Sequence, residues 1–353
     1  MRVGIQLIFQ NLHESLSDAE MVRGEVALGE LADRSGFDFL GLPEHHFDAY
    51  SMSPDNIQTL TWLAARTTSI PLLISAAIMP WHDPLRVAEK TILLDILSEG
   101  RVLFGVGRGL ARMEYEAFRQ DMAEARDRYN ESTAMVLQAL ETGVIRGEGP
   151  YYVQPEIELR PRPIASFQDR VYAVAVSQDS VESAADIGAV MMTFTQKGPE
   201  HHLPLIQHYR ERFEKAQGKK PQPPVLIDFT YCNEDADVAE EVVRKHLLAN
   251  YVATHHHYDM GGEHFRRTKG YENYQAQAEE VRALGLEKAA EEYINAQIWG
   301  TPGQMVDKFR KRAEALGPFA SSLAISYGGM PFETATESMR LIAEEVLPAV
   351  QRI

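Results

Sequence analysis

The amino-acid sequence predicts an α/β protein, a (β/α)8 TIM barrel that spans residues 1–353 as a single domain. Three observations lead to this prediction. Short apolar runs alternate with longer segments of helical period, which is typical of parallel strands joined by helical crossovers. Eight such pairs can be traced, and eight units favour closure into a barrel over an open sheet. The length of 353 residues suits one barrel, although it would also allow two smaller domains.

The predicted strands are short and rich in branched or aromatic apolar residues. The third strand is entered through Pro71, because proline cannot lie in the centre of a strand. The fourth begins at Val102 and ends before Arg108. The other seven predicted strands, the third among them, cover 3–9, 37–42, 71–79, 171–176, 190–194, 225–231 and 321–327.

Helical segments follow the strands, and the first four cover 18–34, 54–67, 84–97 and 122–141. Two segments depart from the alternation. Residues 146–162 predict a small hairpin excursion, and residues 251–295 are far too long for a simple connection. Because long insertions in compact domains are usually functional, we expect 251–295 to form a mobile lid over the barrel mouth.

Composition narrows the class of protein. Hydrophobic residues make up 44% of the chain, enough for a large core, and the single cysteine, Cys232, excludes an intramolecular disulfide and fits a reducing compartment. No apolar stretch approaches the roughly 18 to 20 residues of a membrane span, and the N-terminus has no cleavage region. We therefore expect a cytoplasmic protein without a membrane partner. The net charge of −16 argues against nucleic acid as a partner but leaves room for a local basic site.

The stretch Arg101 to Gly109, RVLFGVGRG, is a candidate anion site at the end of the fourth strand. Glycine lets the backbone approach a ligand closely, and the guanidinium of Arg108 offers forked donors suited to phosphate. Leu110 stands where the dinucleotide fingerprint requires its third glycine, and no GK[ST] follows for a P-loop. On spacing alone, an ordinary glycine-rich turn is favoured over a phosphate site.

A second candidate anion site follows the fifth strand, where Ser177-Gln178-Asp179-Ser180 precedes a helix. Ser177, Ser180 and free backbone N–H groups could bind an anion at the positive end of that helix. The simpler interpretation is a helix start in which Asp179 and Glu182 form a capping box. Since Arg108 follows the neighbouring strand, both sites could share one anion.

Histidines follow the second strand in Pro43-Glu44-His45-His46-Phe47, which places them on the catalytic face of a barrel. Catalysis and simple packing are both open for His45. The adjacent His45 and His46 point in different directions and make a poor metal site. The consecutive histidines 255–257 fan around a helix, so we expect them in a solvated or lid position and predict no metal. Glu114 and Glu116 are expected on a solvated turn. A nucleophilic serine is disfavoured because GxSxG is absent, and Cys232 has no catalytic signature.

Several ordered motifs together resemble one family. EHHF after the second strand, SAAIM in the third, LLDILSEGRVLFGVGRGL through the fourth, WGTP near the C-terminus and a late strand ending in YGG are similar to the bacterial luciferase family of flavin-dependent monooxygenases. The likeness covers nearly the whole chain and is nearer to the luciferase α subunit than to the β subunit. It implies a (β/α)8 barrel that binds reduced FMN delivered by a separate flavin reductase, with O2 as cosubstrate.

The resemblance also implies roles for single residues. His45 matches the histidine needed for the productive flavin peroxide reaction, and Arg108 and Arg126 match arginines on the FMN phosphate. Ser177 matches a phosphate-binding serine, and Ser180 replaces a threonine. Ala76 and Ala77 match a pair joined by a cis peptide beside the isoalloxazine. The expected cofactor-binding residues are Ala76, Ala77, Gly107, Arg108, Gly109, Leu110, Arg126, Val176, Ser177 and Ser180, and the expected substrate walls are Phe9, Trp81 and Tyr231.

Two departures from the family limit what the resemblance implies. Gly107 replaces the reactive cysteine of luciferase and is expected to enlarge the space near the flavin, and Val176 replaces a glutamate. We therefore do not expect light emission or specificity for long-chain aldehydes. The expected function is a two-component monooxygenase, a homodimer, that oxygenates a small organic substrate through a flavin 4a-hydroperoxide. The alternatives are a deazaflavin-dependent oxidoreductase of the same superfamily and a non-catalytic flavin-binding protein, and the presence of His45 argues against the latter.

Overall fold

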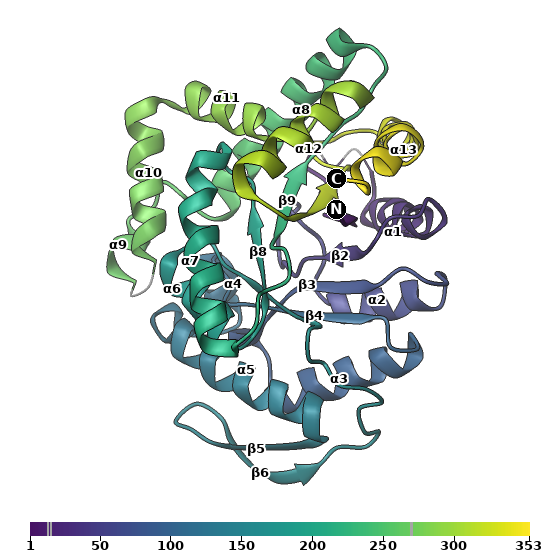
Figure 1. The fold of residues 1–353 in the computed structure, drawn as a ribbon. Helices are drawn as coiled ribbons and strands as arrows, with labels where there is room; N and C mark the ends of the chain where they lie inside the picture. Colours follow the sequence, from purple (N-terminus) through teal and green to yellow (C-terminus); the bar gives the residue numbers. More distant parts are fainter. Residues whose placement is uncertain (13, 15, 269–270) are drawn as a thin grey trace.

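The computed structural model describes residues 1–12, 14, 16–268 and 271–353, and over these ranges eight parallel strands close into a barrel surrounded by helices (Figure 1). Around the barrel the strands follow the order β1, β2, β3, β4, β7, β8, β9, β10 and back to β1. Their bounds are β1 Val3–Gln6, β2 Leu40–Leu42, β3 Leu72–Ile78, β4 Val102–Gly107, β7 Val171–Val174, β8 Val190–Phe194, β9 Val225–Phe229 and β10 Ala320–Ala324. The predicted (β/α)8 barrel is confirmed.

The barrel strands are buried almost throughout, and all seven residues of β3 are buried. Helices cover the outer face and side chains fill the interior, so these strands carry continuous apolar runs. The first and last strands close the barrel through parallel pairing in which Val3 lies opposite Ser321. The chain ends lie side by side in Figure 1, and the ammonium of Met1 is 3.4 Å from the carbonyl oxygen of Val350.

The outer helices begin at local caps that the sequence supplies. The Ser17 and Glu20 pair forms a capping box at the first helix, and the side chain of Asp83 caps the third helix, which starts with Pro84. The helices that follow barrel strands are α1 Asp18–Arg34, α2 Asn56–Ala64, α3 Pro84–Leu97, α4 Arg112–Ala117, α5 Ala125–Thr142, α6 Gln178–Asp186, α7 Pro199–Gln217, α12 Pro302–Leu316, α13 Phe332–Leu341 and α14 Leu347–Val350. Short turns of other helical types are Met79–Trp81, Met122–Glu124 and Ile342–Val346.

Several predicted strands extend too far at their C-terminal ends. β1 ends at Gln6 and β9 at Phe229, although the apolar runs continue to Phe9 and Tyr231. Phe9 has already left the extended conformation, with φ of 59°. The loops beyond the strands are themselves buried, so an apolar run does not mark where the ladder ends. The second helix is shorter than predicted because Asp55 caps it instead of lying within it.

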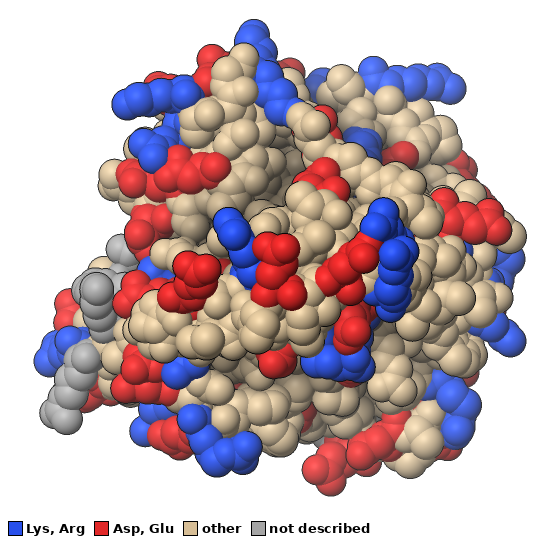
Figure 2. Space-filling model, turned by 90° about the horizontal axis from the view of Figure 1, so that it is seen from below, with Lys and Arg blue, Asp and Glu red and all other residues tan. Residues whose placement is uncertain are grey.

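The predicted excursion at 146–162 is an antiparallel hairpin, β5 Val144–Glu148 with β6 Val153–Glu158, that lies outside the barrel (Figure 1). Its surface carries paired charges, such as Arg160 with Glu158 at 3.1 Å. Figure 2 views the molecule from the side on which this hairpin lies, and acidic and basic side chains are interspersed across that face.

The segment 251–295 is mainly helical. It comprises the end of α8 Ala236–His257, then α9 His264–Arg267, α10 Glu272–Leu284 and most of α11 Leu286–Ala296 (Figure 1). Phe265 and Tyr271 are fully buried in a cluster with Trp81 and Tyr115, so this helical arm packs against the loops that follow β3 and β4. In the part of the chain that the structure describes, no helix has the length and apolarity needed to cross a membrane.

Candidate active site

A cavity that opens to solvent lies at the C-terminal ends of the barrel strands, and the space in and in front of it, open solvent included, is about 1230 Å³. This edge carries the active site in TIM-barrel enzymes. The cavity brings together most of the residues predicted from the sequence, which are His45, Ala76, Trp81, Gly107, Arg108, Gly109, Leu110, Arg126, Val176, Ser177 and Ser180. Three others do not line it. Phe9, Ala77 and Tyr231 are buried in the main hydrophobic core instead.

One end of the cavity collects groups that can bind an anion. Arg108 follows β4 and Ser177 begins α6 after β7, and these two strands are hydrogen-bonded neighbours. Arg126 reaches the same region from α5, where its Nη2 lies 2.8 Å from Oδ2 of the largely exposed Asp179. The Nε of Arg126 is buried without a hydrogen-bond partner among the described residues. Two guanidinium groups therefore meet a helix N-terminus at this end.

The start of α6 differs from the predicted cap. Ser177 is the N-cap residue, and its box partner is Ser180, whose Oγ accepts the backbone N–H of Ser177 at 2.9 Å. The expected box of Asp179 and Glu182 is wrong, because Glu182 pairs with His208 at 2.9 Å. The serine hydroxyls hold the turn that presents this helix end to the cavity.

The glycines after β4 allow close packing under the cavity. Gly109 has φ of 83°, and a Cβ there would lie 2.9 Å from the ring of Trp81. A Cβ on Gly107 would lie 3.0 Å from Ile78 and 3.3 Å from Ala76, so the space that the absent side chain was expected to open is already filled. The enlarged pocket expected at Gly107 is therefore wrong.

The helical arm contacts the same turn from above. The guanidinium of Arg108 stacks over the ring of Tyr271 at 3.9 Å, and the Tyr271 hydroxyl donates to the carbonyl of Gly109 at 3.1 Å. The hydroxyl of Tyr115 donates to the carbonyl of Arg108. These contacts tie the arm to the anion-binding end of the cavity.

A cis non-prolyl peptide is present in β3, but it joins Ser75 to Ala76. The expectation that Ala76 and Ala77 form this bond is wrong by one residue. Ser75 and Ala76 line the cavity, whereas Ala77 pairs with Val106 on β4 and packs in the core.

His45 lines the cavity after β2, and both its ring nitrogens have polar neighbours. Its Nδ1 lies 3.2 Å from Oε1 of Glu114, and its Nε2 lies 3.2 Å from the Tyr258 hydroxyl. Glu114 is completely buried on α4, so the prediction of a solvated turn is wrong for this residue, although Glu116 is exposed. Glu114 and Tyr115 are the buried residues of α4, and Glu114 lines the cavity.

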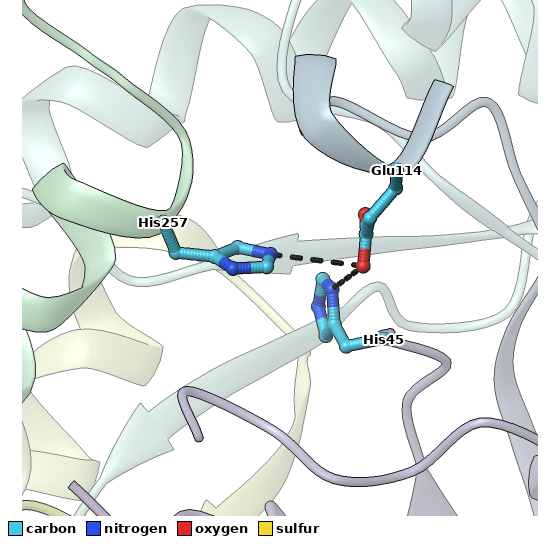
Figure 3. A group of neighbouring side chains, drawn as sticks. All are labelled: His45, Glu114 and His257. Carbon is cyan, nitrogen blue, oxygen red and sulfur yellow. Dashed lines mark hydrogen bonds and ion pairs between the residues drawn. The ribbon is translucent and has the colours of Figure 1, made fainter. Parts of the chain in front are cut away.

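His257, the last residue of α8, is buried beside the same carboxylate (Figure 3). Its Nδ1 lies 3.1 Å from Asp48, and its Nε2 lies 3.7 Å from Oε1 of Glu114. Burial lowers the pKa of His257, which favours the neutral ring. Of the expected solvated or lid position of residues 255–257, His256 is exposed whereas His257 is buried, and the lid stays a prediction.

The side chains of His45, Glu114 and His257 converge from three elements, with ligand atoms within 4.8 Å of one another (Figure 3). Such a group could hold a metal ion. However, Oε1 of Glu114 already accepts the backbone N–H of His46 at 2.7 Å and faces Nδ1 of His45. The hydrogen bonds account for this oxygen, and the absence of a metal stays a prediction.

Glu44 organises the other side of the His45 loop. It is buried, accepts from His46 and His82 and receives the backbone N–H of Ile78 at 2.9 Å. Burial alone would raise the pKa of Glu44, but the hydrogen bonds from His46 and His82 lower it to about 2. The contact with Glu44 fixes the ring of His46, which points away from His45.

Comparisons with known proteins identify the family of this chain. A family model described as luciferase-like monooxygenase matches residues 1–318. The alkanal monooxygenase alpha chain of Photorhabdus laumondii is 24% identical over 339 residues, covering 94% of this chain and 93% of that protein. The oxygenase component of the flavin-dependent trigonelline monooxygenase of Acinetobacter baylyi is 24% identical over 367 residues, covering 99% and 95%.

A solved structure shares the fold. The oxygenating constituent of the 3,6-diketocamphane monooxygenase from Pseudomonas putida, a type II Baeyer–Villiger monooxygenase in complex with FMN, has a TM-score of 0.77 and 17% identity, covering 99% of this chain and 98% of that chain. The family model matches most of the chain. The chain therefore belongs to the luciferase-like monooxygenase family, whose members are flavin-dependent oxidoreductases.

Proposed function

We propose that this protein is a two-component monooxygenase that binds reduced FMN and uses O2 to oxygenate a small organic substrate. The observation that carries the proposal is a single cavity with two distinct ends. Arg108, Arg126 and the start of α6 form a basic end, and His45 follows a strand two positions further around the barrel from β4. A ligand with a phosphate at one end and a reactive ring at the other suits this layout.

The residues present fit FMN. The buried Nε of Arg126 lacks a hydrogen-bond partner among the described residues and can donate to a phosphate oxygen. The cavity is lined by both apolar and polar side chains and opens to solvent, which would let a flavin and a small substrate enter from the barrel mouth. When bound, the reduced flavin supplies the electrons that activate oxygen.

The chain's own residues would bind the flavin, enclose it and transfer protons. We assign phosphate binding to Arg108, Arg126, Ser177 and Ser180, and the ring wall to the backbone and side chains around Ala76, Gly107, Gly109, Leu110 and Val176. Trp81 is proposed as a substrate wall, whereas Phe9 and Tyr231 would act only through the packing beneath the cavity. The helical arm would exclude water from the ring end, which protects reactive species from loss.

His45 would act as general acid or base near the reacting atoms, since imidazole can change its charge near neutrality. The trigonelline enzyme is named as an oxygenase component, which supports a separate reductase for this chain. Gly107, in place of the reactive cysteine, is the reason to propose an oxygenation without light emission. A homodimer is part of the same proposal.

Titration under anaerobic conditions tests the cofactor. Reduced FMN should bind much more tightly than reduced riboflavin, and a deazaflavin cofactor should bind weakly. The protein should then form product from a panel of aldehydes, ketones, terpenes and sulfur compounds only when O2 and a flavin reductase are present. Hydride transfer from a reduced deazaflavin without O2 would favour the dehydrogenase alternative. Tight flavin binding with no turnover of any kind would favour a binding protein.

A further inference from the structure

The two nitrogens of the His45 ring face different kinds of group. Nδ1 faces the carboxylate of Glu114, which comes from α4, at 3.2 Å (Figure 3). Nε2 faces the hydroxyl of Tyr258 at 3.2 Å, and both His45 and Tyr258 line the cavity. Glu114 lines the same cavity, so the two nitrogens differ in the kind of partner they face, a carboxylate at Nδ1 and a hydroxyl at Nε2.

Glu114 can serve the ring only as an acceptor at this position. Its Oε1 takes the backbone N–H of His46 at 2.7 Å, and its ion-pair partners among the described residues are the histidines His45 and His257. The side chain has no solvent exposure, so its negative charge depends on donors from the protein. The hydrogen atom between Glu114 and His45 is therefore assigned to Nδ1 of the imidazole.

His257 does not compete for this role. Its Nε2 is 3.7 Å from Oε1 of Glu114, which is too long for a hydrogen bond, and its Nδ1 is taken by Asp48 at 3.1 Å. The ring stacks on Tyr50 with centroids 4.5 Å apart. His257 thus packs beside the Glu114 carboxylate without a hydrogen bond to it, and the short side-chain contact of Glu114 is the one with His45.

Tyr258 completes the chain of contacts toward the cavity. Burial, together with the nearby Tyr50 and Glu114, raises the pKa of Tyr258 well above its usual value, so it remains a phenol with a proton to donate. Opposite a protonated Nδ1, the Nε2 of a neutral imidazole is an acceptor. The phenol therefore donates to Nε2 in the free protein.

We propose that Glu114 is a positioning residue that holds His45 in the Nδ1–H tautomer, and that Tyr258 is the partner through which Nε2 exchanges protons with the cavity. This rests on the proposed function for His45. In the transfer, the Tyr258 hydroxyl gives its proton to Nε2 while it takes one from a bound molecule, so no phenolate forms. The imidazolium is stabilised by Glu114, and the proton returns from Nε2 by the same route. Nδ1 keeps its hydrogen throughout, as in the histidine of a serine-protease triad.

Spectroscopy of the free protein tests the tautomer without any turnover. Side-chain ¹⁵N correlation spectra are recorded for ¹⁵N-histidine protein at a pH above the titration of the ring, and His45 is assigned by the signal lost in His45→Gln. We expect Nδ1 to carry the hydrogen and Nε2 to lack it in the wild type. Glu114→Gln should mix the two tautomers, whereas Glu182→Gln, which removes a carboxylate from the His208 pair outside the cavity, should change nothing.

Kinetics tests the consequence for oxygenation. Glu114→Gln should lower product formation by about 10²-fold or more with flavin binding within a few-fold, because the wrong tautomer removes the basic nitrogen from the cavity. Tyr258→Phe should lower it about 10- to 100-fold while the ring keeps its packing. Glu114→Asp retains the carboxylate and should recover part of the rate, and it serves if the glutamine variant does not fold.

The possible results separate this inference from the proposed function. An Nε2–H tautomer in the wild type, or a tautomer unchanged by Glu114→Gln, would overturn the inference whatever the enzyme does. Normal oxygenation by both Glu114→Gln and Tyr258→Phe would also overturn it. A wild type that oxygenates no substrate, but shows the expected tautomer and its loss in Glu114→Gln, would instead count against the proposed function.

Discussion

Removing the guanidinium of Arg108 should separate phosphate binding from ring binding. In Arg108→Ala, hydrogen bonds from a charged donor to phosphate are lost, a contribution of about 1.5 to 3 kcal/mol. At about 1.4 kcal/mol for each factor of ten, reduced FMN should bind about 10- to 150-fold more weakly. Riboflavin has no phosphate, so its affinity should change little. The stacking of Arg108 on Tyr271 is lost in both cases and cancels in the comparison.

The assay is anaerobic titration of both ligands by intrinsic fluorescence or calorimetry. Arg112→Ala is a matched control, since it removes the same charge four residues later from an exposed side chain that pairs with Asp259 at 3.3 Å. It should leave both affinities unchanged. Equal losses of FMN and riboflavin affinity in Arg108→Ala would place this residue away from the phosphate and refute the assignment of the basic end.

Three further predictions follow from the structure. His45→Ala should keep the FMN dissociation constant within a few-fold but lower oxygen transfer about 10²- to 10⁴-fold, with hydrogen peroxide released in place of product; unchanged coupling would remove His45 from the mechanism. Limited proteolysis should cut first within 251–295 and more slowly with flavin bound, and resistance there with cleavage elsewhere would contradict a lid. Burial raises the pKa of Glu25 from 4.5 to about 7. Between pH 4.5 and about pH 7, Glu25 is therefore protonated in the folded protein but ionised in the unfolded chain. The free energy of unfolding consequently falls as the pH rises through this window. Glu25→Gln should remove this fall of about 3 kcal/mol, measured by denaturant unfolding at pH 5 and pH 8, and an equal fall in the variant would exclude Glu25 as its source.

The pattern of apolar residues was sufficient to predict the fold, because each barrel strand is a short buried apolar run and each outer helix has one buried face. The predicted bounds of α1, α3 and β8 match the structure, since caps or a buried run delimit each one. The ends of β1 and β9 could not be located, because the core continues past the ladder. The helices of 251–295 were not predicted, because the segment was treated as one long insertion, although Phe265, Tyr271 and Tyr274 within it contact one another.

The candidate site divides in the same way. Arg108 and Ser177 could be paired from the sequence because strands adjacent in the chain became adjacent in the barrel. The sequence could not show that Glu114, Tyr258 and His257 lie near His45. Their approach to His45 depends on how α4 and the end of α8 fold over the barrel mouth. An available signal was Glu114 in a short helix just after the glycine turn, where a buried carboxylate would require a partner.

Oxygen labelling tests the central claim most directly. The protein is supplied with reduced FMN, ¹⁸O₂ and the best substrate from the panel, and the product is analysed by mass spectrometry with its yield relative to hydrogen peroxide. The proposed function predicts one ¹⁸O atom in each product molecule, and in His45→Ala a strongly reduced yield of this labelled product with hydrogen peroxide in its place. Product that forms without ¹⁸O, or hydrogen peroxide as the sole fate of oxygen with every substrate, would contradict it.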